Sequence, residues 1–94
     1  MAEFVAELYV ARTDTATAGR NAELAREAAE EMAREGTAVL YVRSLFMPED
    51  ETCFLIYEAA SAEAVFEAVG RAALPVERVV ASVAVNNGDE GGTR

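Results

Sequence analysis

The feature that most constrains the fold is a short polar segment, residues 48–52, which separates two strand-forming segments. Residues 38–47 and 53–59 are rich in the aliphatic and aromatic side chains that favour strands. A crossover between parallel strands needs a dozen or more residues, and this polar segment is much shorter. The two strands are therefore predicted to pair as an antiparallel hairpin.

A strand and a helix are predicted before this hairpin. Apolar side chains alternate with others over residues 3–12, which is typical of a half-buried strand. Residues 13–15 then offer several helix-capping oxygens, and an Ala/Glu/Arg-rich stretch runs from there to Glu35. Gly36 follows as a usual residue for ending a helix. The first part of the chain is thus a strand followed by one long helix.

A second helix and a last strand are predicted after the hairpin. Ser61 is expected to cap a helix that runs through Ala73 and is stopped by Pro75. Residues 77–86 supply the last strand. The side chains expected to face inward from this helix are Val65, Phe66 and Val69.

The order β-α-β-β-α-β predicts the α+β fold called ferredoxin-like, a four-stranded antiparallel sheet with two helices on one face. A chain of 94 residues has room for one hydrophobic core, so residues 1–86 are expected to form a single domain. Residues 87–94 contain nothing to bury and are expected to be a flexible tail. The other face of the sheet is open, and it must meet water, a ligand or a second copy of the chain.

The charge balance excludes two classes of partner. The chain has 8 basic and 17 acidic residues, a formal net charge of −9, which repels nucleic acid and anionic membrane surfaces. No apolar run approaches the roughly 20 residues of a membrane span, and no basic leader precedes an apolar segment. A single cysteine cannot form an internal disulfide. These observations together predict a cytoplasmic protein.

Five residues are candidates for a ligand pocket on the open face. Alternation places Glu7 and Tyr9 there, and Glu58 is expected to lie close to Glu7 on the neighbouring strand. Tyr41 and Arg43 are expected to share one face of their strand and to join this cluster, with Arg43 pairing with either carboxylate. Two interpretations stay open. One is a carboxylate that acts as a general base or binds a ligand cation; the other is that Glu7 and Glu58 are solvated or pair with Arg43 across a dimer interface. No residue is assigned as catalytic.

Cys53 is the candidate metal ligand, since a thiolate beside carboxylates suits a divalent transition metal such as nickel, zinc or copper. The chain has no histidine, which is the usual nitrogen ligand for these metals. The alternative interpretation of Cys53 is a small, partly buried apolar residue. The lack of histidine also excludes Ser-His and Cys-His nucleophiles, and the glycines form no phosphate-binding loop.

The hairpin, residues 43–54, and the following residues 58–65 resemble those of a known family. These are the small actinobacterial ferredoxin-like proteins of unknown function that are commonly labelled nickel-binding proteins. The resemblance extends over roughly residues 3–83 and implies the topology predicted above, a homodimer and a bacterial cytoplasmic setting. It also implies a relation to nickel, although nickel-binding members carry histidines in the first strand and around the second helix. Cys53 is the one candidate ligand that matches the family's pattern.

The sequence thus predicts a small dimeric ligand-binding or metal-binding protein whose open sheet faces form or border a pocket. The alternative is a cofactor-independent enzyme of the dimeric α+β barrel kind, an isomerase, cyclase or monooxygenase, which uses the same pocket residues. A third alternative is a subunit with a purely structural role. Whether the open face is enclosed separates these alternatives.

Overall fold

The elements follow one another in the predicted order. The computed structural model describes residues 1–85, so the predicted boundary at residue 86 and the tail, residues 87–94, lie outside the described residues. A short 3-10 helix, η1, forms the tip of the hairpin. The elements are β1 (Ala2–Tyr9), α1 (Thr15–Arg34), β2 (Val39–Met47), η1 (Pro48–Asp50), β3 (Thr52–Ala59), α2 (Ala62–Arg71) and β4 (Val76–Ser82).

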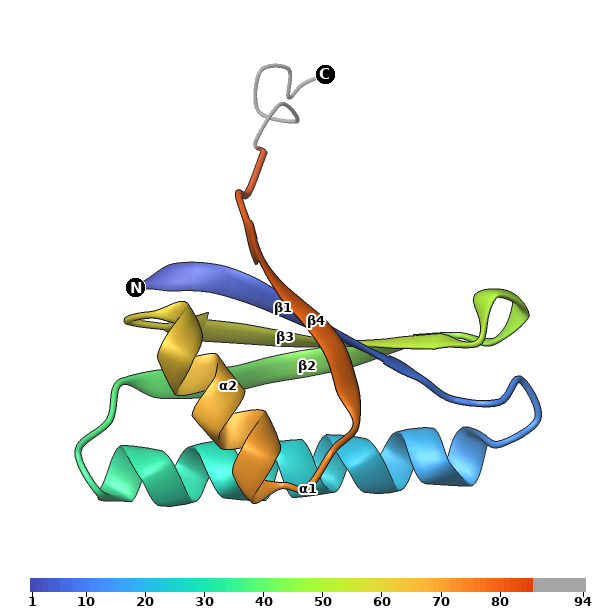
Figure 1. The fold of residues 1–94 in the computed structure, drawn as a ribbon, viewed down its shortest axis with the longest axis horizontal. Helices are drawn as coiled ribbons and strands as arrows, with labels where there is room; N and C mark the ends of the chain where they lie inside the picture. The colour runs from blue at the N-terminus through green and yellow to red at the C-terminus, as the bar shows by residue number, and fades with distance from the viewer. Residues whose placement is uncertain (86–94) are drawn as a thin grey trace, which may run out of the picture.

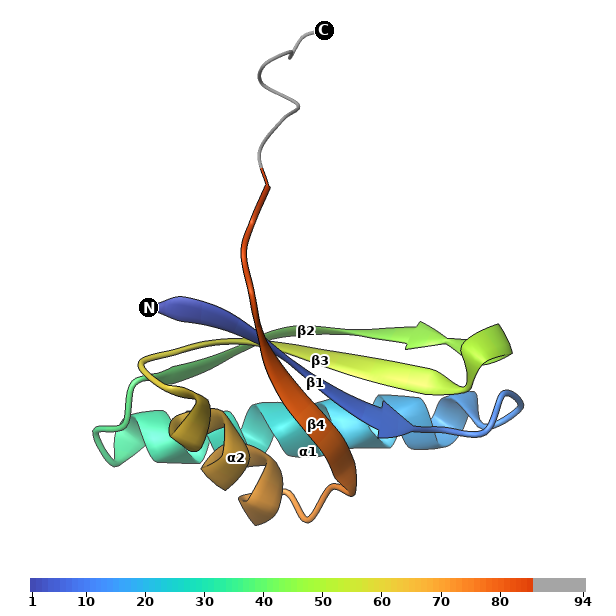
Figure 2. The same cartoon turned by 45° about the horizontal axis from the view of Figure 1, so that its top comes forward.

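The strands form a single sheet in the order β2-β3-β1-β4, with every neighbouring pair antiparallel. Both helices lie on one side of this sheet, as Figures 1 and 2 show. This arrangement confirms the ferredoxin-like α+β prediction. It leaves β2 and β4 as the two edges, and it leaves the second face of the sheet uncovered by any described element.

Local chemistry explains where the helices begin and end. The Asp14 side chain accepts hydrogen bonds from the Thr17 hydroxyl at 2.6 Å and from the Thr17 backbone N–H at 3.1 Å, which hold the pKa of Asp14 below its usual value. Ser61 caps α2 by accepting from the Ala64 N–H at 3.2 Å. Gly36 follows α1 at φ 100°, a backbone conformation that glycine adopts freely. Neither helix in residues 1–85 is both long and apolar enough to cross a bilayer.

The core lies between the sheet and the helices, where the two central strands contribute the largest buried side chains. Leu8, Leu55 and Tyr57 are at most 1% exposed. Small side chains of α1, such as Ala25 and Ala29, pack against them, so this long helix lies close to the sheet. Of the side chains expected to face inward from α2, Phe66 is 53% exposed, and that expectation is wrong.

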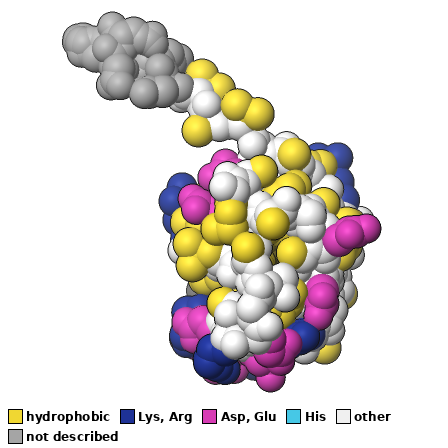
Figure 3. Space-filling model, turned by 90° about the vertical axis from the view of Figure 1, so that its left-hand side faces the viewer, with side chains coloured by type: hydrophobic (Ala, Val, Ile, Leu, Met, Phe, Trp, Pro, Cys, Tyr) yellow, Lys and Arg dark blue, Asp and Glu magenta, His cyan; other side chains and the backbone are white. Residues whose placement is uncertain are grey.

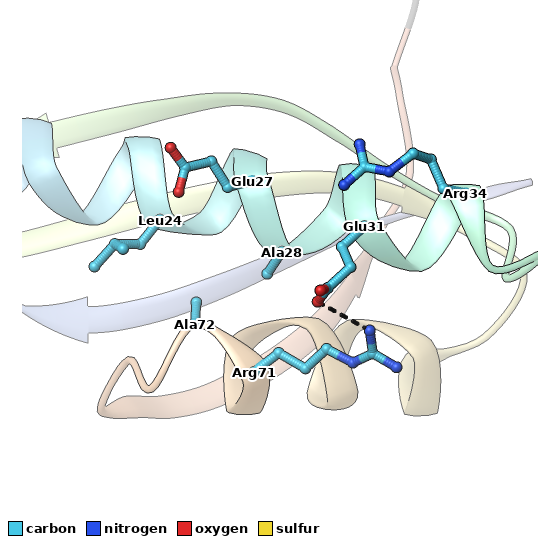
Figure 4. A pocket seen from close by; sticks show the side chains of 7 residues that line it. All are labelled: Leu24, Glu27, Ala28, Glu31, Arg34, Arg71 and Ala72. Atoms are coloured by element: carbon cyan, nitrogen blue, oxygen red, sulfur yellow. Dashed lines mark hydrogen bonds and ion pairs between the residues drawn. The ribbon is translucent and has the colours of Figure 1, made fainter.

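A four-residue charge cluster joins the two helices on their solvent side. The Arg71 guanidinium of α2 donates to Glu31 at 3.1 Å, to Glu35 at 2.7 Å and to Glu67 at 2.8 Å. Figure 3 shows charged side chains of both signs gathered over the helix layer, and Figure 4 shows Arg71 reaching toward Glu31 of α1. The hydrogen bond from Arg71 lowers the pKa of Glu35 below its usual 4.5. Arg71 therefore links the end of α2 to the C-terminal end of α1 through ion pairs.

We expect Arg71→Gln to lower stability in a pH-dependent way. Because the pKa of Glu35 is lower in the folded state than in the unfolded chain, its contribution is present above pH 4.5 and is lost as the pH falls through the folded-state pKa. The difference in free energy of unfolding between parent and variant should therefore be larger at pH 7 than at pH 3, as measured by urea denaturation. A difference that stays constant between these pH values would contradict this account.

Candidate functional site

The open face of the sheet has an apolar row at its centre. The strand register places Val80 of β4 beside Val5 of β1, and Val5 beside Ile56 of β3. Ile56 is only 8% exposed even in a single chain, and Val5 and Val80 are half-buried. Toward the β2 edge the same face carries exposed apolar side chains. These are Leu40, Leu45 and Met47, which are 43–52% exposed, while Val42 at the bulge of β2 is 38% exposed.

Glu7 lies on this face, as predicted, but its cationic partner is Arg78 and not Arg43. The two side chains face each other in the register of β1 and β4, and the Arg78 Nε donates to Glu7 Oε2 at 2.9 Å. On its other side Glu7 is opposite Phe54 of β3. The sequence did not identify Arg78 because it did not show which side chains of the last strand lie on the open face. The register of β4 against β1 provides that information.

Glu58 also lies on the open face, but it is not close to Glu7. Glu58 is opposite Glu3 in the β1–β3 register, and Glu3 accepts a hydrogen bond from the Ser82 hydroxyl at 2.7 Å. Glu58 is four residues along β3 from Phe54, the partner of Glu7, which is about 13 Å at the rise of a strand. The predicted pair of neighbouring carboxylates is therefore wrong, because the apolar row separates them.

Tyr41 and Arg43 lie on opposite faces of β2, which corrects the expectation that they share one. The pairing of β2 with β3 shifts between these two residues, where a bulge inserts Val42. Tyr41 points toward the helices and meets the ring of Tyr57 edge-on, with the ring centroids 6.0 Å apart. Its hydroxyl is 2.6 Å from the Ser44 hydroxyl.

Arg43 is on the open face, opposite Ile56, and is exposed. Within residues 1–85 it forms no ion pair. Its guanidinium is thus a cation beside the apolar row that no carboxylate within residues 1–85 engages. Among the five predicted pocket residues, Glu7, Glu58 and Arg43 share this face, and Tyr41 does not.

Tyr9 is exposed at the end of β1 and is tied to the hairpin tip. Its hydroxyl is 3.4 Å from Glu51 Oε2, and the same carboxylate oxygen accepts from the Arg12 backbone N–H at 3.0 Å. The backbone of Glu51 has φ 49°, which lies in the left-handed region that residues other than glycine rarely adopt. Tyr9 therefore lies at the rim of the open face, away from its apolar centre.

Cys53 is part of the core under the helices and is 0% exposed. Burial raises the pKa of its thiol, which disfavours the thiolate that binds a metal. Tyr57, four residues further along β3, has a buried hydroxyl with no partner in the described part of the chain. Its pKa is raised by burial and, to a smaller extent, by Tyr41. Cys53 and Tyr57 are therefore both packed in the core.

The donor set does not fit a nickel site. The chain has no histidine. Across residues 1–85 no three His, Cys, Asp or Glu side chains are grouped so that they would hold a metal ion. The one soft donor, Cys53, is buried and favours its neutral form. We therefore derive no chemistry through a bound metal.

Among residues 1–85, cavities lie in the helix layer. One, of about 430 Å³, lies between α1 and α2, and Arg71 and Glu31 are among its lining residues (Figure 4). The other, of about 120 Å³, lies between α1 and β2 and reaches Tyr41. Neither is lined by the apolar row of the open face, so neither provides the pocket that the sequence predicted.

Comparison with known proteins gives one family and one similar structure. A family model described as nickel responsive protein SCO4226-like matches residues 9–81. The crystal structure of SCO4226 from Streptomyces coelicolor A3(2) is similar, with a TM-score of 0.63 and 19% sequence identity, over 89% of this chain and 99% of that chain. At this identity the likeness shows the shared fold. No protein with a curated description matches the sequence. Because the family model matches well over half of its length, the chain belongs to the SCO4226-like family of nickel-responsive proteins.

Proposed function

We propose that this protein is a homodimer whose two open sheet faces meet and border a site for a small organic ligand. The observation that supports this most is the apolar row of Val80, Val5 and Ile56, which lies on the sheet face that neither helix covers. A sheet face of this kind is stable when a second layer covers it, and sheets commonly pack face to face about 10 Å apart. A second copy of the chain supplies such a layer.

The charges on the open face favour a second copy over an unrelated partner. In the described part of the chain this face has a cation without an ion-pair partner, Arg43, and carboxylates at Glu3 and Glu58. A twofold axis places the same surface on both partners, so that Arg43 of one copy is able to meet a carboxylate of the other. Such local pairing would offset part of the repulsion between two chains of net charge −9.

The residues around the apolar row suit a ligand with an apolar body and a polar group. Arg43 offers five N–H donors to an anionic or carbonyl oxygen, and the Glu7–Arg78 ion pair borders the row on its other side. The nickel relation in the family's description has no matching donor set in this chain, so we propose an organic ligand. The enzyme alternative has no observation in its favour, since Arg78 engages Glu7 and Tyr41 lies on the other face.

The dimer is tested by placing a charge on the open face. We expect the parent to be dimeric in sedimentation velocity, and Leu45→Glu to raise the dimer dissociation constant at least about tenfold, because an unpaired charge would be buried. Leu45 is 43% exposed in the single chain, so the change should not unfold it. The matched control is Phe66→Glu on α2, which is 53% exposed and should leave the dimer unchanged. A monomeric parent, or equal dissociation by both variants, would contradict the proposal.

The ligand site is tested with 8-anilinonaphthalene-1-sulfonate, a probe that has an apolar body and one anionic group. We expect its fluorescence to rise on binding to the parent dimer, and Arg43→Gln to weaken binding about tenfold by removing a charge-assisted hydrogen bond. Arg20→Gln, a change on α1, is the control and should bind as the parent does. A folded dimer that does not bind the probe would contradict the ligand site and favour a purely structural role. Equal weakening of probe binding by Arg43→Gln and Arg20→Gln would do the same.

Nickel is tested separately by calorimetric titration of the parent and of Cys53→Ala. We expect the two proteins to give the same heats, because the thiol is buried and its pKa is raised. Near-ultraviolet circular dichroism confirms that the variant is folded. Stoichiometric binding to the parent that disappears in Cys53→Ala would assign a metal to this residue and overturn our interpretation.

A further inference from the structure

The strand-forming sequence of β4 continues beyond the part of β4 that pairs within the chain. The sequence predicts a strand over residues 77–86, yet β4 ends at Ser82, which pairs with Glu3 of β1. Its neighbour β1 begins at Ala2, so residues 83–85 have almost no adjacent strand to pair with. β4 therefore ends where its neighbour β1 ends, and not where its own strand-forming sequence ends.

The apolar side chains of this continuation are largely exposed in the described part of the chain. Val83 is 84% exposed and Val85 is 79% exposed, more than any other large apolar side chain among residues 1–85. Figures 1 and 2 show this part of the chain running away from both the sheet and the helices. Figure 3 shows hydrophobic atoms along it. β-branched residues in an extended, unpaired stretch favour addition to the edge of another sheet.

We propose that residues 83–85 are an arm that adds, as a strand, to the β2 edge of a second copy of this chain. This inference rests on the homodimer proposed above and specifies how its edges are joined. β2 is the other edge of the sheet, with one row of backbone N–H and C=O groups unpaired in a single chain. An arm cannot reach β2 of its own chain, because β1 and β3 lie between them.

Two properties of β2 match the arm and a second copy. Its side chains Leu40, Val42, Leu45 and Met47 are exposed and apolar, so they offer contacts to the arm's valines. Its only charged residue is Arg43, a cation that would offset part of the repulsion between two chains of net charge −9. Under twofold symmetry each copy donates one arm and accepts one, so the assembly closes at two chains.

The test combines hydrogen exchange with a pair of variants in the full chain. In the parent we expect the amides of residues 83–85 to be protected at concentrations where the protein is dimeric and to lose protection on dilution. Val83→Asp with Val85→Asp should raise the dimer dissociation constant at least about tenfold, since the arm loses apolar contacts and strand propensity. Val83→Thr with Val85→Thr keeps the β-branched shape and should change it by less than about threefold.

The outcomes separate this arm from the dimer itself. A parent that is monomeric at every concentration would overturn both proposals. A parent dimer that Leu45→Glu dissociates, but in which the amides of residues 83–85 exchange freely, would overturn the arm alone. So would a dissociation constant that Val83→Asp with Val85→Asp leaves unchanged.

Discussion

The pairing of β1 with β3 is the constraint on which the rest of the structure depends. These two central strands pair without interruption from Ala2 opposite Ala59 to Tyr9 opposite Thr52. One side of the pair sends Leu8, Leu55 and Tyr57 into the core, and the other side sends Val5 and Ile56 to the open face. A sheet built on this pair is apolar on both faces, and the two helices cover only one of them. This second face is the one that we propose a second copy covers.

The sequence predicted the elements well because their signals are local. Capping residues, the helix-ending Gly36 and strict alternation act within a few positions, and the helices and strands begin and end close to where these signals lie. Glu7, Glu58 and Arg43 were placed on the open face correctly for the same reason. Alternation assigns a face wherever a strand is regular. It failed for Tyr41, since the bulge at Val42 exchanges the faces and nothing in the residues around it marks the extra residue.

The arrangement of the site was not predictable, because register is set between strands. Glu7 and Glu58 are on one face, but whether they touch depends on how β1 and β3 slide along each other, and the observed register keeps them about 13 Å apart along the strand. The partner of Glu7 is Arg78, a residue 71 positions away that only the β1–β4 pairing brings near. The position at which β4 ends is likewise set by its pairing with β1. A strand extends as far as its neighbour does, and its own composition cannot show that limit.

Membership in the family and the chemistry of this chain give different information about nickel. The family model and the similar fold account for the architecture, whereas a metal site requires particular donor atoms at particular positions. Here the one thiol, Cys53, is packed in the core, and the chain lacks imidazole entirely. Within residues 1–85, the sheet face that no helix covers is instead apolar at its centre and charged at its margins. β2 and β4 form the two edges of this sheet. The proposed second copy would cover this face and both edges together, and the same association would bury the exposed valines beyond Ser82.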